Sequence, residues 1–135
     1  MLRYLLDTNF CIRVLRDKPA SARRRFNEAS EGLAISTVVL TDLLHGAAKS
    51  AKPVENRRAV DDFAARLEVL PFDEAAADHA ADIRADLERR GQMIGGYDVL
   101  IAGQARSRGL TVVTGNLGEF RRVEGLRCED WLEEA

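Results

Sequence analysis

The chain has 135 residues, a length typical of one compact domain, with 46% hydrophobic and 31% charged residues. No apolar run approaches the roughly 20 residues of a membrane-spanning helix, or the apolar stretch of a secretory signal. Twenty basic and 22 acidic side chains leave a net charge of −2, which gives no overall attraction for a nucleic acid. We therefore expect a single domain over residues 1–135, located in the cytoplasm and without a membrane partner.

The first half of the chain alternates short apolar runs with segments of helical periodicity. Pro19 and Gly32 mark helix ends, and Ser36 can cap the helix that follows it. The elements expected here, in chain order, are strand 3–7, helix 8–17, helix 19–32, strand 33–36, helix 37–50, helix 54–67 and strand 68–72.

The second half continues in the same manner. Asp73 caps a long helical pattern that stops at Gly91, and a second helical pattern ends at Gly109. The elements expected here are helix 74–91, helix 97–109, strand 110–114, a short segment 117–123 and a final strand around Leu126. Short apolar strands separated by helices predict an α/β domain of three layers, with a central, mostly parallel sheet flanked by helices.

Polar residues directly follow two of the apolar strands. Asp7 ends the first strand, and Thr114 ends the most β-branched one, followed by Gly115 and Asn116. In parallel sheets ligands bind beyond the carboxyl ends of the strands, at the point where the strand order reverses. These two strand ends are therefore expected to border a site.

Four carboxylates are candidates for one acidic site, namely Asp7, Asp42, Asp98 and Glu119. Each also has a structural explanation, since Asp7 and Asp98 lie at helix starts, where the helix dipole favours an anion. Asp42 is equally a helix-surface residue, and Glu119 a partner for Arg122. The surroundings favour a site, because Asp42 and Asp98 stand among aliphatic and small residues rather than in polar stretches.

Carboxylates gathered in a partly buried cleft repel one another unless a cation neutralises them. Oxygen ligands favour a hard ion such as Mg²⁺ or Mn²⁺, which retains waters and leaves room for a phosphate. Such an ion stabilises charge on phosphate oxygens and lowers the pKa of an attacking water. The acids therefore indicate metal-dependent phosphodiester hydrolysis without a covalent intermediate.

Four segments of the chain together resemble the PIN-domain ribonucleases, specifically the VapC-type toxins of bacterial toxin–antitoxin pairs. The segments are LLDTNFCI, STVVLTDLLHGA, YDVLIAGQA and VVTGNLGEF, and the resemblance extends from about Leu2 to Trp131. It implies a PIN fold and an Mg²⁺- or Mn²⁺-dependent endoribonuclease that cleaves structured RNA, often tRNA. It also implies a homodimer and inhibition by a cognate VapB-type antitoxin.

The resemblance also implies a role for each motif residue. The implied catalytic acids, of which the first three would bind the metal, are Asp7, Asp42, Asp98 and Glu119. The residues implied to position substrate or water are Asn9, Thr114 and Asn116. Gly95 and Gly96 either give RNA or antitoxin close access to Asp98 or only shape the turn into its helix.

One position departs from the family pattern, because Asp42 stands where the second motif usually carries Glu. The charge is kept, and the reach shrinks by one C–C bond, roughly 1.5 Å. That difference exceeds the tolerance of metal–oxygen distances, so we expect weaker metal binding and attenuated activity unless a water bridge or a helix shift compensates.

Two further hypotheses stay open. A PIN module impaired at Asp42 would bind antitoxin and RNA without cleaving. An α/β phosphatase would use Asp7 as a nucleophile, but that class needs a second Asp two residues later, where Asn9 stands. Activity with a restored glutamate at position 42 distinguishes these hypotheses.

Overall fold

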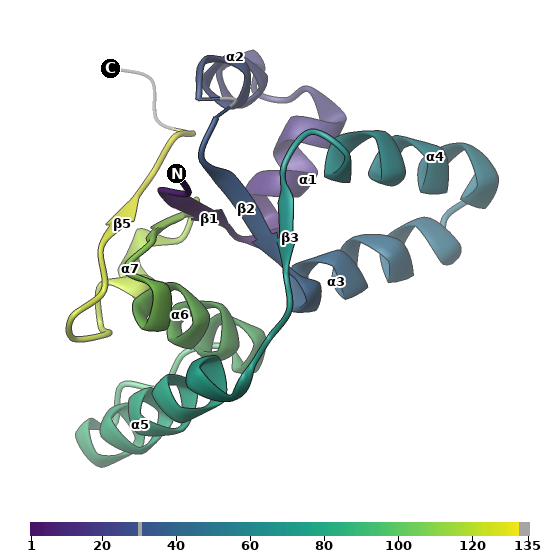
Figure 1. The fold of residues 1–135 in the computed structure, drawn as a ribbon. Coiled ribbons are helices and arrows are strands. Elements are labelled where there is room, and N and C mark those ends of the chain that lie inside the picture. Colours follow the sequence, from purple (N-terminus) through teal and green to yellow (C-terminus); the bar gives the residue numbers. More distant parts are fainter. Residues whose placement is uncertain (30, 133–135) are drawn as a thin grey trace.

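The computed structural model describes residues 1–29 and 31–132 (Figure 1). Its strands are β1 (Tyr4–Leu6), β2 (Leu33–Ser36), β3 (Glu68–Leu70), β4 (Thr111–Val113) and β5 (Cys128–Glu129). Its helices are α1 (Thr8–Arg16), α2 (Ala20–Glu28), α3 (Thr37–Ala48), α4 (Pro53–Ala64), α5 (Glu74–Arg90), α6 (Gly96–Arg108) and α7 (Leu117–Phe120). Within these ranges no helix is both long enough and apolar enough to cross a bilayer.

The elements follow the expected order, and two placements were wrong. The second helix ends at Glu28, not at Gly32, because the carbonyl oxygen of Gly32 accepts from the backbone N–H groups of Arg3 and Tyr4 and so belongs to the start of the sheet. The last strand begins at Cys128, not around Leu126, because a turn at Gly125, with φ of 76°, delays the pairing with β4. Val112 then pairs with Cys128 in parallel register. The sequence offers no long apolar run there, so only the neighbouring strand fixes where β5 starts.

The five strands form one sheet in the order β3-β2-β1-β4-β5, and every neighbouring pair is parallel (Figure 1). β2 and β3 follow β1 on one side of it, and β4 and β5 lie on the other side. The strand order therefore reverses between β1 and β4, where Leu5 lies opposite Val112. This is the switch point at which open α/β sheets bind their ligands.

Helices cover both faces of the sheet, as the right-handed rule for parallel connections requires. The helices α1 to α4 connect β1, β2 and β3, whereas α5 and α6 form a pair on the return path to β4 (Figure 1). The three-layer α/β fold expected from the sequence is confirmed, and the sheet is entirely rather than mostly parallel.

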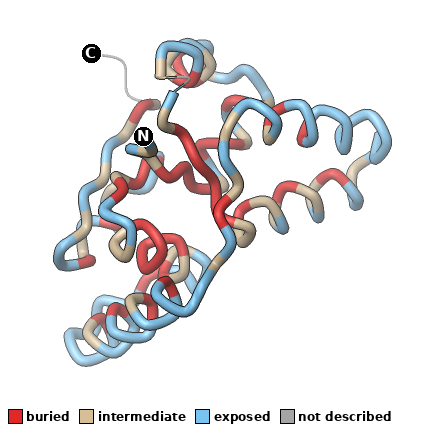
Figure 2. Tube along the Cα trace, in the orientation of Figure 1, coloured by how far each residue is buried: buried red, intermediate tan, exposed pale blue. Residues whose placement is uncertain are grey.

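The core lies between the central strands and the helices that cover them (Figure 2). Leu5 and Leu6 on β1 are fully buried, as is Ile35 on β2. On the helices, Phe10 and Ala102 are equally inaccessible. Central strands of a sheet that is covered on both faces read as continuous apolar runs, and this explains why they were recognisable from the sequence.

A glycine allows α5 and α6 to pack unusually close together. A Cβ atom at Gly103 would stand 2.6 Å from the backbone nitrogen of Ala80 and 2.7 Å from its Cα. No side chain fits at that distance, so Gly103 sets the position of α6 against α5. The N-terminal turn of α6 carries Asp98, and the packing therefore helps to place that carboxylate.

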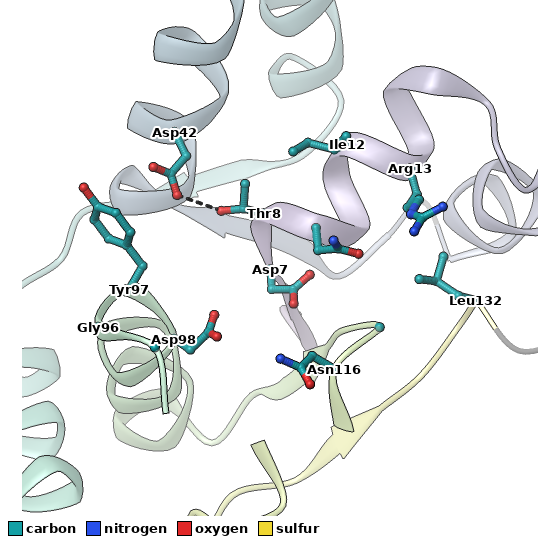
Figure 3. A pocket seen from close by; sticks show the side chains of 13 residues that line it. Asp7, Thr8, Ile12, Arg13, Asp42, Gly96, Tyr97, Asp98, Asn116 and Leu132 are labelled. Carbon is teal, nitrogen blue, oxygen red and sulfur yellow. Dashed lines mark hydrogen bonds between the residues drawn. The ribbon is translucent and has the colours of Figure 1, made fainter. Parts of the chain in front are cut away.

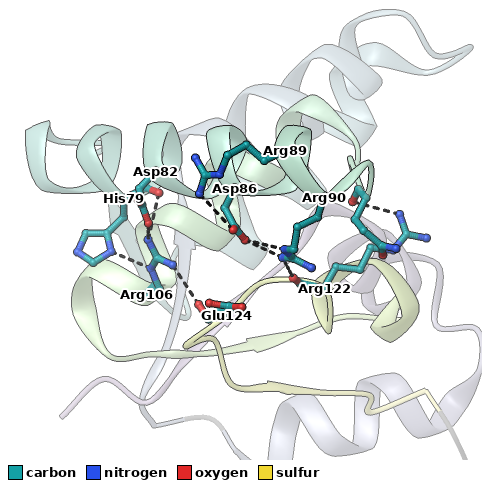
Figure 4. A network of polar contacts seen from close by, with 9 residues as sticks. His79, Asp82, Asp86, Arg89, Arg90, Arg106, Arg122 and Glu124 are labelled. Atoms are coloured by element: carbon teal, nitrogen blue, oxygen red, sulfur yellow. Dashed lines mark hydrogen bonds and ion pairs between the residues drawn. The ribbon is translucent and has the colours of Figure 1, made fainter.

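A polar network fastens the same helix pair to the segment that leads into β5 (Figure 4). Arg106 on α6 donates from Nε to His79 Nδ1 at 2.9 Å and from Nη2 to Asp82 Oδ2 at 2.8 Å, both on α5. Its Nη1 donates to the carbonyl oxygen of Glu124 at 3.0 Å. Because this one guanidinium on α6 binds both α5 and the segment at Glu124, the edge of the sheet at β5 is fixed relative to α5 and α6.

Trp131 anchors the chain after β5. Its side chain is 2% exposed, and its ring packs edge-on against Tyr4 at 4.9 Å and Phe10 at 5.6 Å between centroids. These contacts join residues near both ends of the described chain. As a result Asp130 and Leu132, the neighbours of Trp131, lie close to the carboxyl end of β1.

Candidate active site

A cavity of about 650 Å³ opens at the reversal of strand order, beyond the carboxyl ends of β1 and β4 (Figure 3). Five of the residues predicted for a site line it, namely Asp7, Asn9, Asp42, Asp98 and Asn116. They come from the start of α1, from α3, from the start of α6 and from the turn after β4. Its volume lies in the range of about 300–1,000 Å³ that ligand pockets occupy.

Asp7 caps α1 and also borders the cavity. Its Oδ1 accepts a hydrogen bond from the backbone N–H of Phe10 at 2.8 Å, and the residue is 3% exposed. Burial raises the pKa of its carboxyl group, hydrogen bonds from Thr114 and Phe10 lower it, and the charge of Asp130 raises it again. Asp7 therefore caps the helix that follows it, as its position at a helix start predicted. It also lines the cavity, so the capping role does not exclude a role in the site.

Asp42 reaches the cavity from α3 and is held by Thr8. The Thr8 hydroxyl donates to Asp42 Oδ2 at 3.1 Å, linking the first turn of α1 to the middle of α3 (Figure 3). Thr8 directly follows Asp7 in the chain and lines the same cavity. The bond fixes one carboxylate oxygen of Asp42 and leaves the other free for a further partner.

Asp98 is the most strongly perturbed acid of the cavity. Burial, a hydrogen bond with Glu119 and the charges of Asp7, Glu119 and Asp42 raise its pKa from 3.8 to about 7. The negative charges of three other acids therefore act on Asp98, and these acids belong to three different elements of the fold. The four predicted acids thus form one electrostatic cluster, because each of the other three acts on Asp98.

Thr114 and Glu119 do not line the cavity itself. Thr114 is buried beside Asp7, and its Oγ1 accepts from the backbone N–H of Asn116 at 2.8 Å. The side-chain amide of Asn116 donates to Glu119 Oε2 at 2.7 Å. Both residues therefore contact the side chains that border the cavity. Thr114 hydrogen-bonds to Asp7, and Glu119 hydrogen-bonds to Asn116 and Asp98.

The acids of the site suit a hard cation, although they do not yet form a cage for one. Within the described residues, no three Asp, Glu, His or Cys side chains stand close enough together to hold a metal as they are. Burial is the main cause of the raised pKa values of Asp7 and Asp98, and neighbouring carboxylates raise both further, Asp130 for Asp7 and the three other predicted acids for Asp98. A cation that binds carboxylate oxygens relieves this repulsion, so the donor set fits Mg²⁺ or Mn²⁺.

Sequence reasoning missed several residues that the fold brings to the site. Those that line the cavity are Thr8, Ile12, Arg13, Tyr97 and Leu132, and Asp130 acts on Asp7 through its charge. Thr8 and Tyr97 were adjacent to predicted acids, and this adjacency was the signal that could have identified them. Nothing near Asp130 indicated a contact with Asp7, because only the packing of Trp131 brings it there.

Residues 4–126 match the family model described as PIN domain. A Shigella flexneri protein named tRNA(fMet)-specific endonuclease VapC is 50% identical over 131 residues, covering 97% of this chain and 99% of that protein. Ribonuclease VapC2 of Haemophilus influenzae is 40% identical, with 98% and 100% of the two chains covered. The crystal structure of DNA-bound VapBC from Salmonella typhimurium superimposes with a TM-score of 0.93 at 50% identity, covering 97% of this chain and 99% of that one.

The chain belongs to the PIN-domain family, whose model matches residues 4–126, and the acidic cavity lies at the switch point of its sheet. Within that family its similarity over nearly the whole length places it with the VapC ribonucleases. The resemblance inferred from the four sequence segments is confirmed.

Proposed function

We propose that this chain is the toxin of a type II toxin–antitoxin pair, a metal-dependent endoribonuclease that cleaves structured RNA, with tRNA as its substrate class. It acts in the cytoplasm as a single PIN domain over residues 1–135. The observation that carries the proposal is the convergence of Asp7, Asp42 and Asp98 on one cavity, where the pKa of Asp98 is raised to about 7. The names of the VapC relatives support RNA as the substrate.

A VapB-type antitoxin is the proposed protein partner. The Salmonella typhimurium chain that superimposes on this one was crystallised as VapBC with DNA, and similar toxin–antitoxin complexes are known from Rickettsia felis and Haemophilus influenzae. We further propose that two copies of this chain associate as a homodimer.

The proposed metal ligands are Asp7, Asp42 and Asp98, whose carboxylates point into the same opening (Figure 3). A bound Mg²⁺ or Mn²⁺ supplies charge stabilisation on phosphate oxygens and a water of lowered pKa. Asp7 is kept in place by its hydrogen bond to the start of α1, and Asp42 by its hydrogen bond from Thr8. These bonds pre-orient the ligands before any substrate arrives.

The remaining predicted residues act on substrate or on those ligands. Asn9 and Asn116 border the cavity and offer amide donors and acceptors to a phosphate or a water. Thr114 supports Asp7 from beneath, and Glu119 accepts from Asn116 and shares a hydrogen bond with Asp98.

The test compares the purified chain with its Asp42→Glu and Asp98→Asn variants on a tRNA pool, with Mg²⁺, with Mn²⁺ and with EDTA. We expect cleavage by the unmodified chain that requires the metal, and a loss of at least about 10–100-fold in Asp98→Asn. We also expect Asp42→Glu to be the more active protein, because its carboxylate reaches roughly 1.5 Å further.

The outcome also separates the alternatives. Cleavage by the Asp42→Glu variant alone identifies the natural chain as an impaired module that binds without cutting. Cleavage of RNA by neither protein, together with phosphate release from small esters, identifies a phosphatase. RNA cleavage that persists in EDTA contradicts the metal assignment.

A further inference from the structure

Two exposed side chains border the acidic cavity without a partner of their own. Tyr97 is 58% exposed at the start of α6, and Arg13 is exposed on α1. Both line the cavity, with Tyr97 beside Asp42 and Asp98 and with Arg13 on the opposite side, near Leu132 (Figure 3). Within residues 1–29 and 31–132 neither side chain forms a hydrogen bond, an ion pair or a ring contact.

Arg13 has a charge that the rest of the cavity lacks. Among the described residues that line the cavity, it is the only basic one, whereas Asp7, Asp42 and Asp98 are acids. A nucleic-acid strand that enters must bring its phosphates near these carboxylates, which repel them. An unpaired guanidinium at the rim offers a bidentate partner for a phosphate and does not use the acids that would bind the metal.

Tyr97 presents an open aromatic face at the other rim. The two residues before it are Gly95 and Gly96, and a Cβ atom at Gly96 would meet nothing within 4 Å. Neither glycine has a side chain that could cover the ring. An exposed ring of this kind stacks on a nucleobase of any identity, provided that the base is unpaired and its face is free.

We propose that Tyr97 and Arg13 position the RNA for cleavage, as a pair that recognises an unpaired nucleotide. The proposal rests on the proposed ribonuclease function and names the two side chains of this chain that select the nucleotide to be cleaved. Tyr97 stacks on the base next to the cleaved bond, and Arg13 binds a neighbouring phosphate across the cavity. A base-paired segment is rejected because its bases are already stacked and cannot lie on Tyr97.

The experiment measures binding of a fluorescent hairpin RNA with an unpaired loop and of a fully paired duplex of the same length. The parent protein is Asp7→Asn, which removes a proposed metal ligand and so prevents cleavage during titration, while its amide oxygen can still cap α1. The test variants add Tyr97→Leu, Tyr97→Phe or Arg13→Gln to this parent. Matched controls add Met93→Ala, another exposed apolar side chain, and Arg108→Gln, at the far end of α6.

We expect Tyr97→Leu to weaken hairpin binding by about 5- to 150-fold, the range for loss of one base–aromatic stack, while Tyr97→Phe retains it. Arg13→Gln should weaken hairpin binding and lower the slope of log affinity against log salt by about 0.7, the value for one phosphate of a single strand. Tyr97→Leu should leave that slope unchanged. The controls should bind as the parent does, and the duplex should bind weakly to all variants.

Equal hairpin affinity in the parent and in all three test variants overturns the inference and leaves the proposed function in place. The inference also fails if Tyr97→Leu weakens only the complex with an antitoxin, because Tyr97 then belongs to a protein-binding surface. A parent that binds no RNA, together with an unmodified chain that cleaves none, overturns the proposed function as well.

Discussion

Replacing Asp98 with asparagine should stabilise the metal-free protein at alkaline pH. The pKa of Asp98 is raised to about 7 in the folded chain, chiefly by burial and by Glu119, so the folded state holds a proton that the unfolded state has released. A raised carboxyl pKa contributes stability that is fully present below the unfolded value of 3.8 and is lost as the pH rises through about 7. Above that pH the unmodified chain must carry a crowded negative charge, which the asparagine removes.

The size of the effect follows from the pKa shift. A rise from 3.8 to about 7 corresponds to about 4 kcal/mol at 1.36 kcal/mol per unit, an upper bound for this position. Asp98 is only half-buried, and solvent screens its interactions with Asp7 and Asp42, which reduces the expected gain to about 1–2 kcal/mol. In a domain of this size such a gain raises the melting temperature by about 3–8 °C.

The assay is thermal unfolding of both proteins at pH 8 and pH 4 in EDTA, and again at pH 8 with Mg²⁺. Asp98→Asn should melt higher at pH 8 in EDTA and at the same temperature or lower at pH 4, where the natural acid is protonated. Added Mg²⁺ should stabilise the unmodified chain and not the variant, because a ligand stabilises only the protein that binds it. An Asp98→Asn variant that melts no higher at pH 8 in EDTA would refute the view that burial and the neighbouring acids disfavour the charge of Asp98.

Three further substitutions test other contacts. Thr8→Val removes the hydrogen bond to Asp42 and should lower the cleavage rate by about 10–100-fold at an unchanged melting temperature; full activity would deny Thr8 a positioning role. Gly103→Ala forces a methyl group to 2.6 Å from Ala80 N and should reduce the free energy of unfolding by about 1–3 kcal/mol in urea titration, whereas a neutral result would mean that α6 shifts freely. Trp131→Ala should reduce the free energy of unfolding by about 3–5 kcal/mol in the same titration, and a small loss would show that this ring does not anchor the chain after β5.

The sheet and the acids were predictable because their signals are local. The central strands are short and largely apolar, and Asp7 and Thr114 immediately follow two of them. Parallel topology alone brings the ends of such strands to one edge, so their proximity could be inferred without coordinates. Asp98 was predictable for a different reason, since a charged residue among small and apolar neighbours is unusual on the surface.

The rest of the site depends on contacts between segments that are distant in the chain. Asp130 acts on Asp7 only because Trp131 packs against Tyr4 and Phe10, and β5 contributes just two residues to the sheet. No local pattern encodes that packing. The same applies to the hydrogen bond from Thr8 to Asp42, which spans 34 residues of sequence.

The hydrogen bond from Thr8 changes how the short side chain at Asp42 should be understood. A carboxylate that lost one methylene without compensation would be a free, mobile ligand, but Asp42 is held at 3.1 Å by a residue of the helix that Asp7 caps. The two acids are thus fixed relative to each other through the first turn of α1, at the distance this fold sets. A longer Glu side chain at position 42 gains reach and at the same time moves its oxygens away from Thr8. The gain in cleavage rate expected from Asp42→Glu is therefore the benefit of the added reach minus the cost of the lost hydrogen bond. This gain should be larger in a Thr8→Val background, where there is no hydrogen bond to lose.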